Sequence, residues 1–427
     1  MTQVAVVGLG KIGLPLAALY ASKGMDVAGC DIDESVVDAV NAGVSPIAGE
    51  PGLDDAIAKG HKAGRLRATT DTAAAVAESD VIVMVVRVAL DESRAPDFSQ
   101  LDAAAEAVGR GLRPGALVIL ETTMPVGATR NHLGAHLRDA SGLEEGAFHL
   151  VYSPERVQSG RLYHDLETYP KLIGGVDEES GQKAADFYRR VLNAEVRILP
   201  DAETAEFTKL AESVYRDVNI ALANELAKAA DALGVDFATA AQAANSQPFS
   251  HLHVPGVGVG GHCIPVYPYF LLETVDQPII RLARETNDGM AAYALDRLAE
   301  ALPGGLAGKT VLVLGLAYRG GVREVMLSSA LELVAELRAR GARAIVHDPL
   351  FSDAEIAAYG VEPSPLPPEA PIDAVILQAA HPEYRDLNPA TLKGCRVFLD
   401  GRGGFDRGRV EAAGMRYIRI GGGSREA

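Results

Sequence analysis

The fold of this chain is decided near its start by the stretch Val4-Ala5-Val6-Val7-Gly8-Leu9-Gly10-Lys11-Ile12-Gly13. The apolar run predicts a buried strand, and the Gly-x-Gly-x-x-Gly pattern after it leads into a helical pattern. Gly8 permits a tight turn, Gly10 lets the backbone approach a pyrophosphate, and Gly13 allows the helix to pack closely on the strand. The stretch therefore predicts the first strand–turn–helix unit of a dinucleotide-binding domain.

A second predicted strand ends at Asp31, close to the separation of about 20 residues at which such domains carry an acidic side chain. A carboxylate there binds a ribose 2′-hydroxyl and repels a 2′-phosphate, which favours NAD over NADP. A plain strand–helix turn without a cofactor is the alternative, and the complete strand–turn–helix–strand context argues against it. The residues expected to bind NAD are Gly8, Gly10, Lys11, Ile12, Gly13 and Asp31.

Short apolar runs alternate with helical patterns through the first 200 residues, which predicts a parallel sheet with helices on both faces. Residues 202–233 contain no Gly or Pro, and we expect one long helix that links two halves and forms a dimer interface. A second alternating region begins at Lys309. The predicted strands are residues 4–7, 26–31, 80–86, 116–121, 149–152, 171–175, 195–199, 310–316, 342–347, 374–378 and 396–400, with a helix at 328–340.

These patterns predict an α/β fold in which two Rossmann-like doubly wound domains are joined by a long central helix and a helical middle domain. We expect an NAD-binding domain over residues 1–200 and a helical middle domain over 201–300 that carries Lys209 and Cys263. The C-terminal Rossmann-like domain is expected over residues 301–427.

Composition restricts the partners of the chain. A formal net charge of −17 argues against nucleic acid or an anionic membrane surface as the main partner. No apolar run reaches the roughly 20 residues of a membrane span, and the start has no signal-peptide pattern. Three cysteines are too few for a disulfide framework. We therefore expect a soluble cytoplasmic protein.

Cys263 lies near the end of the loop Pro255-Gly256-Val257-Gly258-Val259-Gly260-Gly261-His262-Cys263-Ile264-Pro265. So many glycines and prolines do not build a core, but they let a backbone approach a ligand closely. A cysteine at the end of such a loop is a candidate nucleophile. Cys30 and Cys395 border predicted strands, and packing is their expected role.

Two further features near this loop are ambiguous. Lys209 lies early in the predicted long helix with Ser213 four residues on, so both project from one face, but such a lysine is more often a surface charge. His251, His253 and His262 match no familiar zinc spacing, so no metal is expected.

Over nearly its whole length the chain resembles the UDP-glucose/GDP-mannose dehydrogenase family, the nucleotide-sugar 6-dehydrogenases. Seven segments in the same order carry the resemblance, which is far more specific than a fold analogy. They are the N-terminal glycine motif, Glu121-Thr122-Thr123-Met124-Pro125-Val126-Gly127, Ser153-Pro154-Glu155-Arg156-Val157, Lys209-Leu210-Ala211-Glu212, Gly260-Gly261-His262-Cys263-Ile264-Pro265, Gly315-Leu316-Ala317-Tyr318 and Asp400-Gly401-Arg402.

The resemblance implies an oxidoreductase that uses two NAD in sequence to oxidise the C6 primary alcohol of a UDP-sugar to a uronic acid for polysaccharide biosynthesis. The thiolate of Cys263 would attack the intermediate aldehyde, and the thiohemiacetal would be oxidised to a thioester. Lys209 would stabilise the oxyanion and Glu155 would orient or deprotonate the hydrolytic water. Thr123 would hold a water or a sugar hydroxyl, and Ser213 belongs to the same proton network. The residues implied for substrate binding are Arg156, Lys209, Gly260, Tyr267, Arg319 and Arg402.

From the residues alone, Thr123 is as well explained as a helix cap and Glu155 as a surface carboxylate. Both follow predicted strands, and ligands of doubly wound sheets gather at the carboxyl ends of strands. The family match favours the catalytic roles.

Four positions depart from the family pattern. The chain has Tyr267 where well-known members carry Asp, Ser213 where they carry Asn, Met326 where they carry Arg, and Lys11 where Tyr is usual. Tyr267 cannot replace a carboxylate as a base at neutral pH, whereas Ser213 can still donate one hydrogen bond. Altered proton transfer, an altered sugar or a reaction that stops at the aldehyde are all compatible with these changes, and we expect the complete reaction.

Residues 215–220 and 260–265 are more similar to members that act on UDP-N-acetylhexosamines, although those members often have an arginine near Phe249. We therefore expect a UDP-N-acetylhexosamine as substrate and a homodimer as the assembly. The alternatives are an oxidation that stops at the aldehyde, an NAD-retaining nucleotide-sugar epimerase that needs no nucleophilic cysteine, and a non-catalytic nucleotide-sugar sensor.

Overall fold

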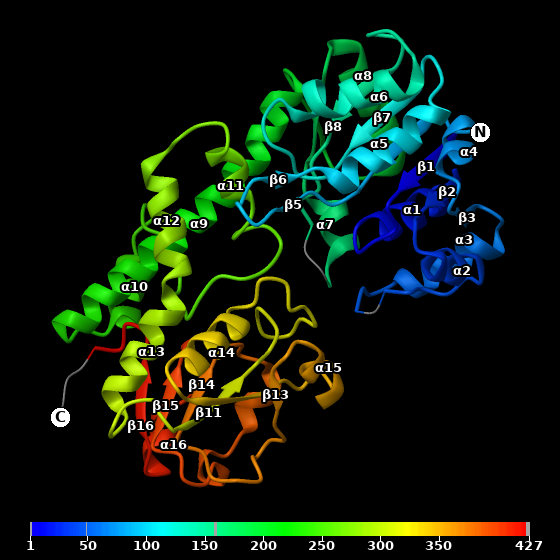
Figure 1. Ribbon diagram of the computed structural model, residues 1–427. Helices are drawn as coiled ribbons and strands as arrows, with labels where there is room; N and C mark the ends of the chain where they lie inside the picture. Colours follow the sequence, from blue (N-terminus) through cyan, green and yellow to red (C-terminus); the bar gives the residue numbers. More distant parts are fainter. Residues whose placement is uncertain (1, 48, 158–159, 424–427) are drawn as a thin grey trace. The chain divides into compact units, whose positions relative to one another are not determined.

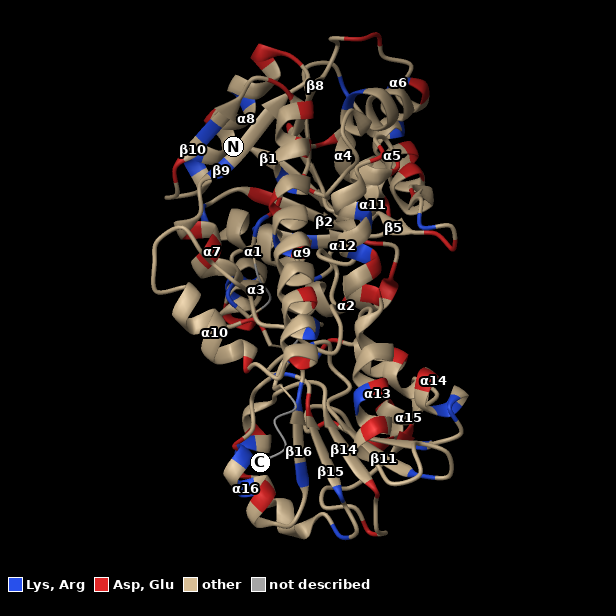
Figure 2. Ribbon diagram, turned by 90° about the vertical axis from the view of Figure 1, so that its left-hand side faces the viewer, with Lys and Arg blue, Asp and Glu red and all other residues tan. Residues whose placement is uncertain are grey.

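The computed structural model describes residues 2–47, 49–157 and 160–423, which form a mixed α/β structure of two compact units (Figure 1). The first unit comprises Met1–Glu212 and Tyr269–Val275, and the second comprises Ser213–Pro268 and Asp276–Ala427. The division into three domains at residues 200 and 300 stays a prediction. No helix in the described ranges is long and apolar enough to cross a membrane. Acidic and basic residues are interspersed along the helices and loops of each unit (Figure 2).

The first unit is built on an eight-stranded sheet of order β10-β9-β8-β7-β4-β1-β2-β3. Its strands are β1 (Gln3–Val7), β2 (Asp26–Cys30), β3 (Leu66–Thr69), β4 (Val81–Met84), β7 (Leu117–Leu120), β8 (His149–Tyr152), β9 (Lys171–Gly175) and β10 (Val196–Leu199). Its helices are α1 (Gly13–Ser22), α2 (Glu34–Asn41), α3 (Leu53–Lys62), α4 (Thr72–Ala77), α5 (Ser99–Gly111), α6 (Gly134–Ser141), α7 (Leu162–Thr168) and α8 (Glu178–Val191), and a two-stranded ribbon is formed by β5 (Ala89–Leu90) and β6 (Pro96–Asp97).

Two strands of this sheet run against the predicted direction. Strands β3, β2, β1, β4, β7 and β8 are parallel, whereas β9 pairs with β8 antiparallel and β10 follows β9. The connection from β8 contains the short α7, and β9 then begins at the carboxyl end of β8. For β9 to be parallel to β8, the chain would have to cross the face of the sheet and begin β9 at the amino end of β8. As a result, the first residue of β9, Lys171, lies at the carboxyl end of β7 and β8.

The second unit has a six-stranded parallel sheet of order β13-β12-β11-β14-β15-β16. Its strands are β11 (Thr310–Leu314), β12 (Arg343–His347), β13 (Glu362–Pro363), β14 (Ala374–Leu377), β15 (Val397–Asp400) and β16 (Arg416–Arg419). Its helices are α10 (Phe237–Ala244), α12 (Pro278–Asp288), α13 (Met290–Ala301), α14 (Ser329–Ala339), α15 (Asp353–Ala358) and α16 (Arg407–Ala412). The sequence did not predict β3, β13 or β16, which are edge strands, and β3 and β16 carry arginines.

Helix α9 (Ala202–Leu233) coincides with the predicted long helix. Its start is capped by Asp201, whose carboxylate accepts the N–H of Thr204 at 2.7 Å. It ends before Gly234, which adopts a left-handed φ of 68°. The boundary between the two units falls inside this helix, after Glu212.

A buried carboxyl attaches the start of α9 to the first unit. The carboxylate of Glu206 accepts the N–H of Gly127 at 2.5 Å and the N–H of Thr129 at 2.8 Å, where a π-helical turn (Thr129–Leu133) begins. Glu206 has no exposed surface, and burial raises its pKa from 4.5 to about 7 against the opposing effect of the two N–H donors. One turn earlier, Glu203 forms an exposed ion pair with Arg130 at 2.7 Å, and its pKa is lowered.

The raised pKa of Glu206 predicts a pH-dependent stability. The folded chain holds a proton that the unfolded chain has released, so this contribution to the free energy of unfolding falls as the pH rises from 4.5 to about 7 and is constant above. Glu206→Gln removes the titration. The difference in free energy of unfolding, wild type minus variant, should therefore fall by about 1–3 kcal/mol between about pH 5 and about pH 7.5 in urea titrations.

Glu203→Gln is the matched control for this measurement, because Glu203 is ionised in both states across that range. Its difference from the wild type should stay constant with pH. A Glu206→Gln curve that runs parallel to the wild-type curve would contradict the assignment of a raised pKa to Glu206.

Candidate functional site

The glycine turn lies at the carboxyl end of β1, directly before α1. Gly8 has a left-handed φ of 93°, and its N–H donates to the carbonyl of Cys30 at 2.8 Å. A Cβ at Gly13 would lie 1.8 Å from the carbonyl oxygen of Gly8, whereas a Cβ at Gly10 would meet nothing within 4 Å. Gly13 is therefore required by packing, and Gly10 faces open space at the helix N-terminus, where a pyrophosphate fits.

Asp31 follows β2 beside this turn. One oxygen of its carboxylate accepts the N–H of Leu9 at 2.7 Å and the other accepts the N–H of Asp33 at 3.0 Å. A carboxylate has about four acceptor sites, so capacity remains for ribose hydroxyls. The next residue, Ile32, is 96% exposed. The residues of this edge fit NAD, which accepts a hydride when bound.

A buried charged cluster lies at the carboxyl ends of β7 and β8. The Nζ of Lys171 is 2.7 Å from a carboxylate oxygen of Glu121 and 3.3 Å from one of Glu155. The second oxygen of Glu121 accepts the hydroxyl of Tyr188 at 2.5 Å and that of Tyr20 at 3.5 Å. Side-chain exposure is 5% for Lys171, 0% for Glu121 and 11% for Glu155, so this charge network is shielded from water.

The network gives its two carboxyls different protonation behaviour. Burial raises the pKa of Glu121, although the ammonium of Lys171 opposes the rise. Burial also disfavours the charge on Glu155, but Lys171, hydrogen bonds and the charge of Lys209 outweigh it, and the pKa of Glu155 is lowered. For Lys171, the two carboxylates outweigh burial and raise the pKa. Glu155 is thus held as a carboxylate, which is the form that a general base needs.

Two of the catalytic residues predicted in the first unit, Lys209 and Glu155, are in direct contact. The Nζ of Lys209, on α9, donates to the backbone carbonyl of Glu155. Thr123 is 5% exposed in the segment between β7 and the π-helical turn, and the N-terminal cap position of that turn is Ala128, so Thr123 is not its cap. The side chain of Glu155 is only 11% exposed and contacts Lys171, so it is not a solvated surface carboxylate.

Arg156, predicted to bind substrate, contacts the chain itself. Its guanidinium is 2.6 Å from a carboxylate oxygen of Glu212, and it donates to the carbonyl of Pro170 at 3.1 Å. Ser213, predicted to be catalytic, is fully buried on α9. Substrate binding by Arg156 and proton transfer by Ser213 stay predictions.

The three cysteines have free thiols in different surroundings. Cys263 is partly exposed in the glycine-rich loop of the second unit. Cys30 and Cys395 are buried, and burial raises the pKa of each thiol to about 12, which makes them inert at neutral pH. The carbonyl of Cys263 accepts the N–H of Tyr267 at 2.9 Å, where α11 (Tyr267–Leu272) begins.

The glycines of the Cys263 loop are explained by packing within the second unit. A Cβ at Gly260 would lie 2.5 Å from the carbonyl oxygen of Leu327, and one at Gly261 would lie 3.2 Å from the ring of Tyr318. The N–H of Gly261 donates to the carbonyl of Met326 at 2.8 Å. The position of Cys263 is therefore set by a loop pressed against residues 318 and 326–329.

Two arginines of the second unit were predicted to bind the nucleotide. Arg319 is exposed and its guanidinium lies 5.8 Å from the ring centroid of Tyr318. Arg402 donates to the carbonyl of Gln378 at 2.5 Å and to that of Gly258 at 3.3 Å. Its Nη2 is buried and has no hydrogen-bond partner within the described ranges. Burial lowers the pKa of Arg402 to about 10, so the group remains cationic at neutral pH.

The histidines near Cys263 do not gather. Within residues 2–47, 49–157 and 160–423, no three metal-ligating groups come together among His251, His253 and His262. His262 instead lies 3.3 Å from a carboxylate oxygen of Glu324, and the ring of His253 packs edge-on against Tyr215.

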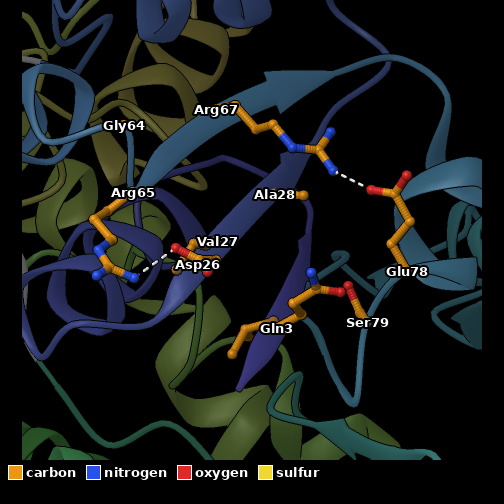
Figure 3. Close-up of a pocket in the computed structure, with 10 residues that line it drawn as sticks. Gln3, Asp26, Val27, Ala28, Gly64, Arg65, Arg67, Glu78 and Ser79 are labelled. Carbon is orange, nitrogen blue, oxygen red and sulfur yellow. Dashed lines mark hydrogen bonds and ion pairs between the residues drawn. The ribbon is translucent and has the colours of Figure 1, made fainter. Parts of the chain in front are cut away.

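A surface cavity of about 350 Å³ lies elsewhere in the first unit (Figure 3). It is lined by the starts of β1, β2 and β3, at the edge of the sheet opposite to the glycine turn. Arg65 is paired with Asp26 and Arg67 with Glu78, both at 2.7 Å. Parallel α/β sheets bind ligands at the carboxyl ends of their strands, so this cavity is not the candidate active site.

Sequence reasoning missed the partners that prepare Glu155. Sequence patterns predict no role for Lys171, Tyr188, Tyr20 or Glu121. A usable signal was present, since Lys171 opens an apolar strand and Glu121 follows another. Charged groups at such places are rarely buried unless they are paired.

Comparison with known proteins gives a consistent result along the chain. Residues 2–192, 203–289 and 312–407 match the NAD binding domain, the central domain and the UDP binding domain of the UDP-glucose/GDP-mannose dehydrogenase family. A UDP-N-acetyl-D-mannosamine dehydrogenase of Pyrococcus horikoshii is 37% identical over 94% of this chain and 95% of its own length. An NDP-N-acetyl-D-galactosaminuronic acid dehydrogenase of Ralstonia nicotianae is 35% identical over 96% of this chain and 97% of its own.

Solved structures agree. The structure of UDP-D-ManNAc dehydrogenase from Pyrococcus horikoshii superposes with a TM-score of 0.88 at 34% identity, covering 98% of this chain and 99% of that one. The Rossmann-like units and the glycine turn define the protein as an NAD-dependent oxidoreductase. The chain belongs to the UDP-glucose/GDP-mannose dehydrogenase family, as its sequence motifs predicted.

The two glycines of the cofactor turn give a matched test. Gly13→Ala places a Cβ against the carbonyl of Gly8, so we expect a loss of about 1–3 kcal/mol in the free energy of unfolding. Gly10→Ala meets no protein atom and should change it by no more than about 0.5 kcal/mol. Gly10→Ala should nevertheless weaken NAD binding by about tenfold or more, because the methyl group occupies the approach to the pyrophosphate. Urea unfolding and NAD titration check both; equal stability with unchanged NAD affinity in the two variants would contradict this geometry.

Proposed function

We propose that this chain oxidises the C6 primary alcohol of a UDP-N-acetylhexosamine to the uronate in two NAD-dependent steps. The observation that carries the proposal is the buried carboxylate of Glu155, held by Lys171 beside the ammonium of Lys209. The relatives in Pyrococcus and Ralstonia, named for N-acetylmannosamine and N-acetylgalactosaminuronic acid, support an N-acetylated sugar.

Each residue has one task in the proposed sequence. After the first two-electron oxidation, the Cys263 thiolate adds to the C6 aldehyde and forms a thiohemiacetal, whose oxygen carries the negative charge. Lys209 stabilises this oxyanion, and Thr123 holds the sugar hydroxyl or a water. The second two-electron oxidation leaves a thioester. Glu155 takes a proton from water, which attacks the thioester and releases the carboxylate and the thiol of Cys263.

We propose that residues of the second unit bind the substrate and that residues beside Asp31 bind the cofactor. The buried Nη2 of Arg402 supports a role in binding the diphosphate, because an anion would satisfy it. Arg319, Tyr267 and the backbone at Gly260 are proposed to contact the nucleotide sugar. Beside Asp31, the exposed side chain of Ile32 offers an apolar surface for the adenine ring of NAD.

We also propose a homodimer in a reducing compartment such as the cytoplasm. In the second unit, α9 exposes Tyr215, Leu222 and Leu226 by 54%, 47% and 38% at heptad-like spacing, which is typical of a helix that packs against a partner. A monomeric mass in light scattering would exclude the dimer. The three free cysteines agree with a reducing environment, in which the thiol of Cys263 stays available.

The proposal is tested by NADH formation with UDP-N-acetylmannosamine, UDP-N-acetylglucosamine and UDP-glucose, with products identified by mass spectrometry. We expect about two NADH per sugar and a carboxylate product with an N-acetylated sugar, as four-electron oxidation requires. Cys263→Ala should abolish the carboxylate, while Cys395→Ala, which alters a buried thiol, should retain it.

The outcomes separate the alternatives. One NADH and an aldehyde would mean that Tyr267 and Ser213 mark a shortened reaction. No net NADH with interconverted sugars would indicate an epimerase, and ligand binding without turnover would indicate a sensor. Normal acid production by Cys263→Ala would contradict the thioester route.

A further inference from the structure

Two histidines and an aspartate, all partly exposed and with no recorded contact to Glu121, Glu155 or Lys171, converge in the first unit. Asp102 lies in the first turn of α5, His132 in the π-helical turn, and His136 in α6. Helices α5 and α6 lie side by side (Figure 1). One ligand atom from each of the three residues lies within 4.8 Å of the other two.

One separation is that of a direct hydrogen bond, and the other is close to the spacing of two ligands around an ion. The Nε2 of His132 is 2.5 Å from Oδ1 of Asp102, and the Nε2 of His136 is 3.7 Å from the same oxygen. The two imidazole rings have centroids 4.7 Å apart. Donor atoms at about 2.0–2.2 Å from a metal lie roughly 3–3.5 Å from one another. An ion would replace the direct contact between His132 and Asp102, and the three donor atoms already lie within 4.8 Å of one another.

The surroundings favour coordination by these groups. The ring of Phe98 stacks on His132 with centroids 4.2 Å apart, which fixes the plane of the imidazole. The side chains are 29%, 42% and 33% exposed for His132, His136 and Asp102, so water can complete the coordination. The π-helical turn that carries His132 is itself an uncommon geometry, and such turns often occur at functional sites.

We propose that Asp102, His132 and His136 bind a divalent transition-metal ion of the zinc class. Two imidazoles and one carboxylate suit such ions, whereas Mg²⁺ and Ca²⁺ prefer oxygen ligands alone. The ion joins α5 to the π-helical turn Thr129–Leu133 and to α6. It thereby stabilises the folded first unit, because only the folded chain brings the three donors together.

The test is a calorimetric titration of the chelator-treated full chain with Zn²⁺, in a Cys263→Ser background so that the thiol does not compete. We expect one ion per chain. Asp102→Asn and His136→Gln should each weaken the affinity for Zn²⁺ by more than about tenfold. A loss of about tenfold is typical when only a partner outside the coordination shell is removed. His164→Gln, which removes an exposed histidine of α7, is the matched control and should bind like the parent.

Thermal unfolding without metal first shows that the variants are folded. Added Zn²⁺ should then raise the melting temperature of the parent and of His164→Gln but not that of the two ligand variants. Absence of binding by the parent at millimolar Zn²⁺ would overturn the proposal. Parent-like affinity and melting in both ligand variants would overturn it as well, since the ion would then be bound elsewhere.

Discussion

The ammonium of Lys171, held between the carboxylates of Glu121 and Glu155, is the interaction on which the proposed chemistry depends. Two carboxyls and one ammonium are removed from water at one edge of a sheet. Charges shielded from water are tolerated only when each has partners. The hydroxyl of Tyr188 donates to Glu121, and the N–H groups of Arg156 and Val157 donate to Glu155. The asymmetry of these partners separates the two carboxyls, because Glu121 has a raised pKa and Glu155 a lowered one.

The reversal of β9 makes this interaction available. A strand that crossed over to run parallel would place Lys171 at the opposite edge, far from the ends of β7 and β8. Helix α9 completes the arrangement, because its first turns carry both Glu206, which binds the turn after Thr123, and Lys209, which binds the carbonyl of Glu155. A single helix thus positions the two segments that follow β7 and β8.

Local patterns predicted much of this structure. The glycine turn, the alternation of strands and helices, and the bounds of α9 all follow from short-range rules of backbone geometry and periodicity. The direction of β9 did not, because an apolar strand reads the same in either direction. The partners of Glu155 also escaped prediction, since Lys171 and Tyr188 approach it only through the fold. In the second unit, the sequence predicted that the glycine loop approaches a ligand, and this stays a prediction. Packing against Tyr318 and Leu327, which the sequence did not predict, already requires glycine at 260 and restricts the side chain at 261.

In the proposed reaction, Lys171 keeps Glu155 ionised for the hydrolytic step. The most direct measurement is the pH profile of kcat for acid formation in the wild type and in the double variant Lys171→Met with Glu121→Gln, which removes the cation together with its buried partner. We expect the acidic limb to move to higher pH by at least about one unit, because Glu155 then loses its stabilising charge at a site largely shielded from water. A folded, active double variant whose acidic limb stays in place would show that Lys171 does not control the ionisation of Glu155.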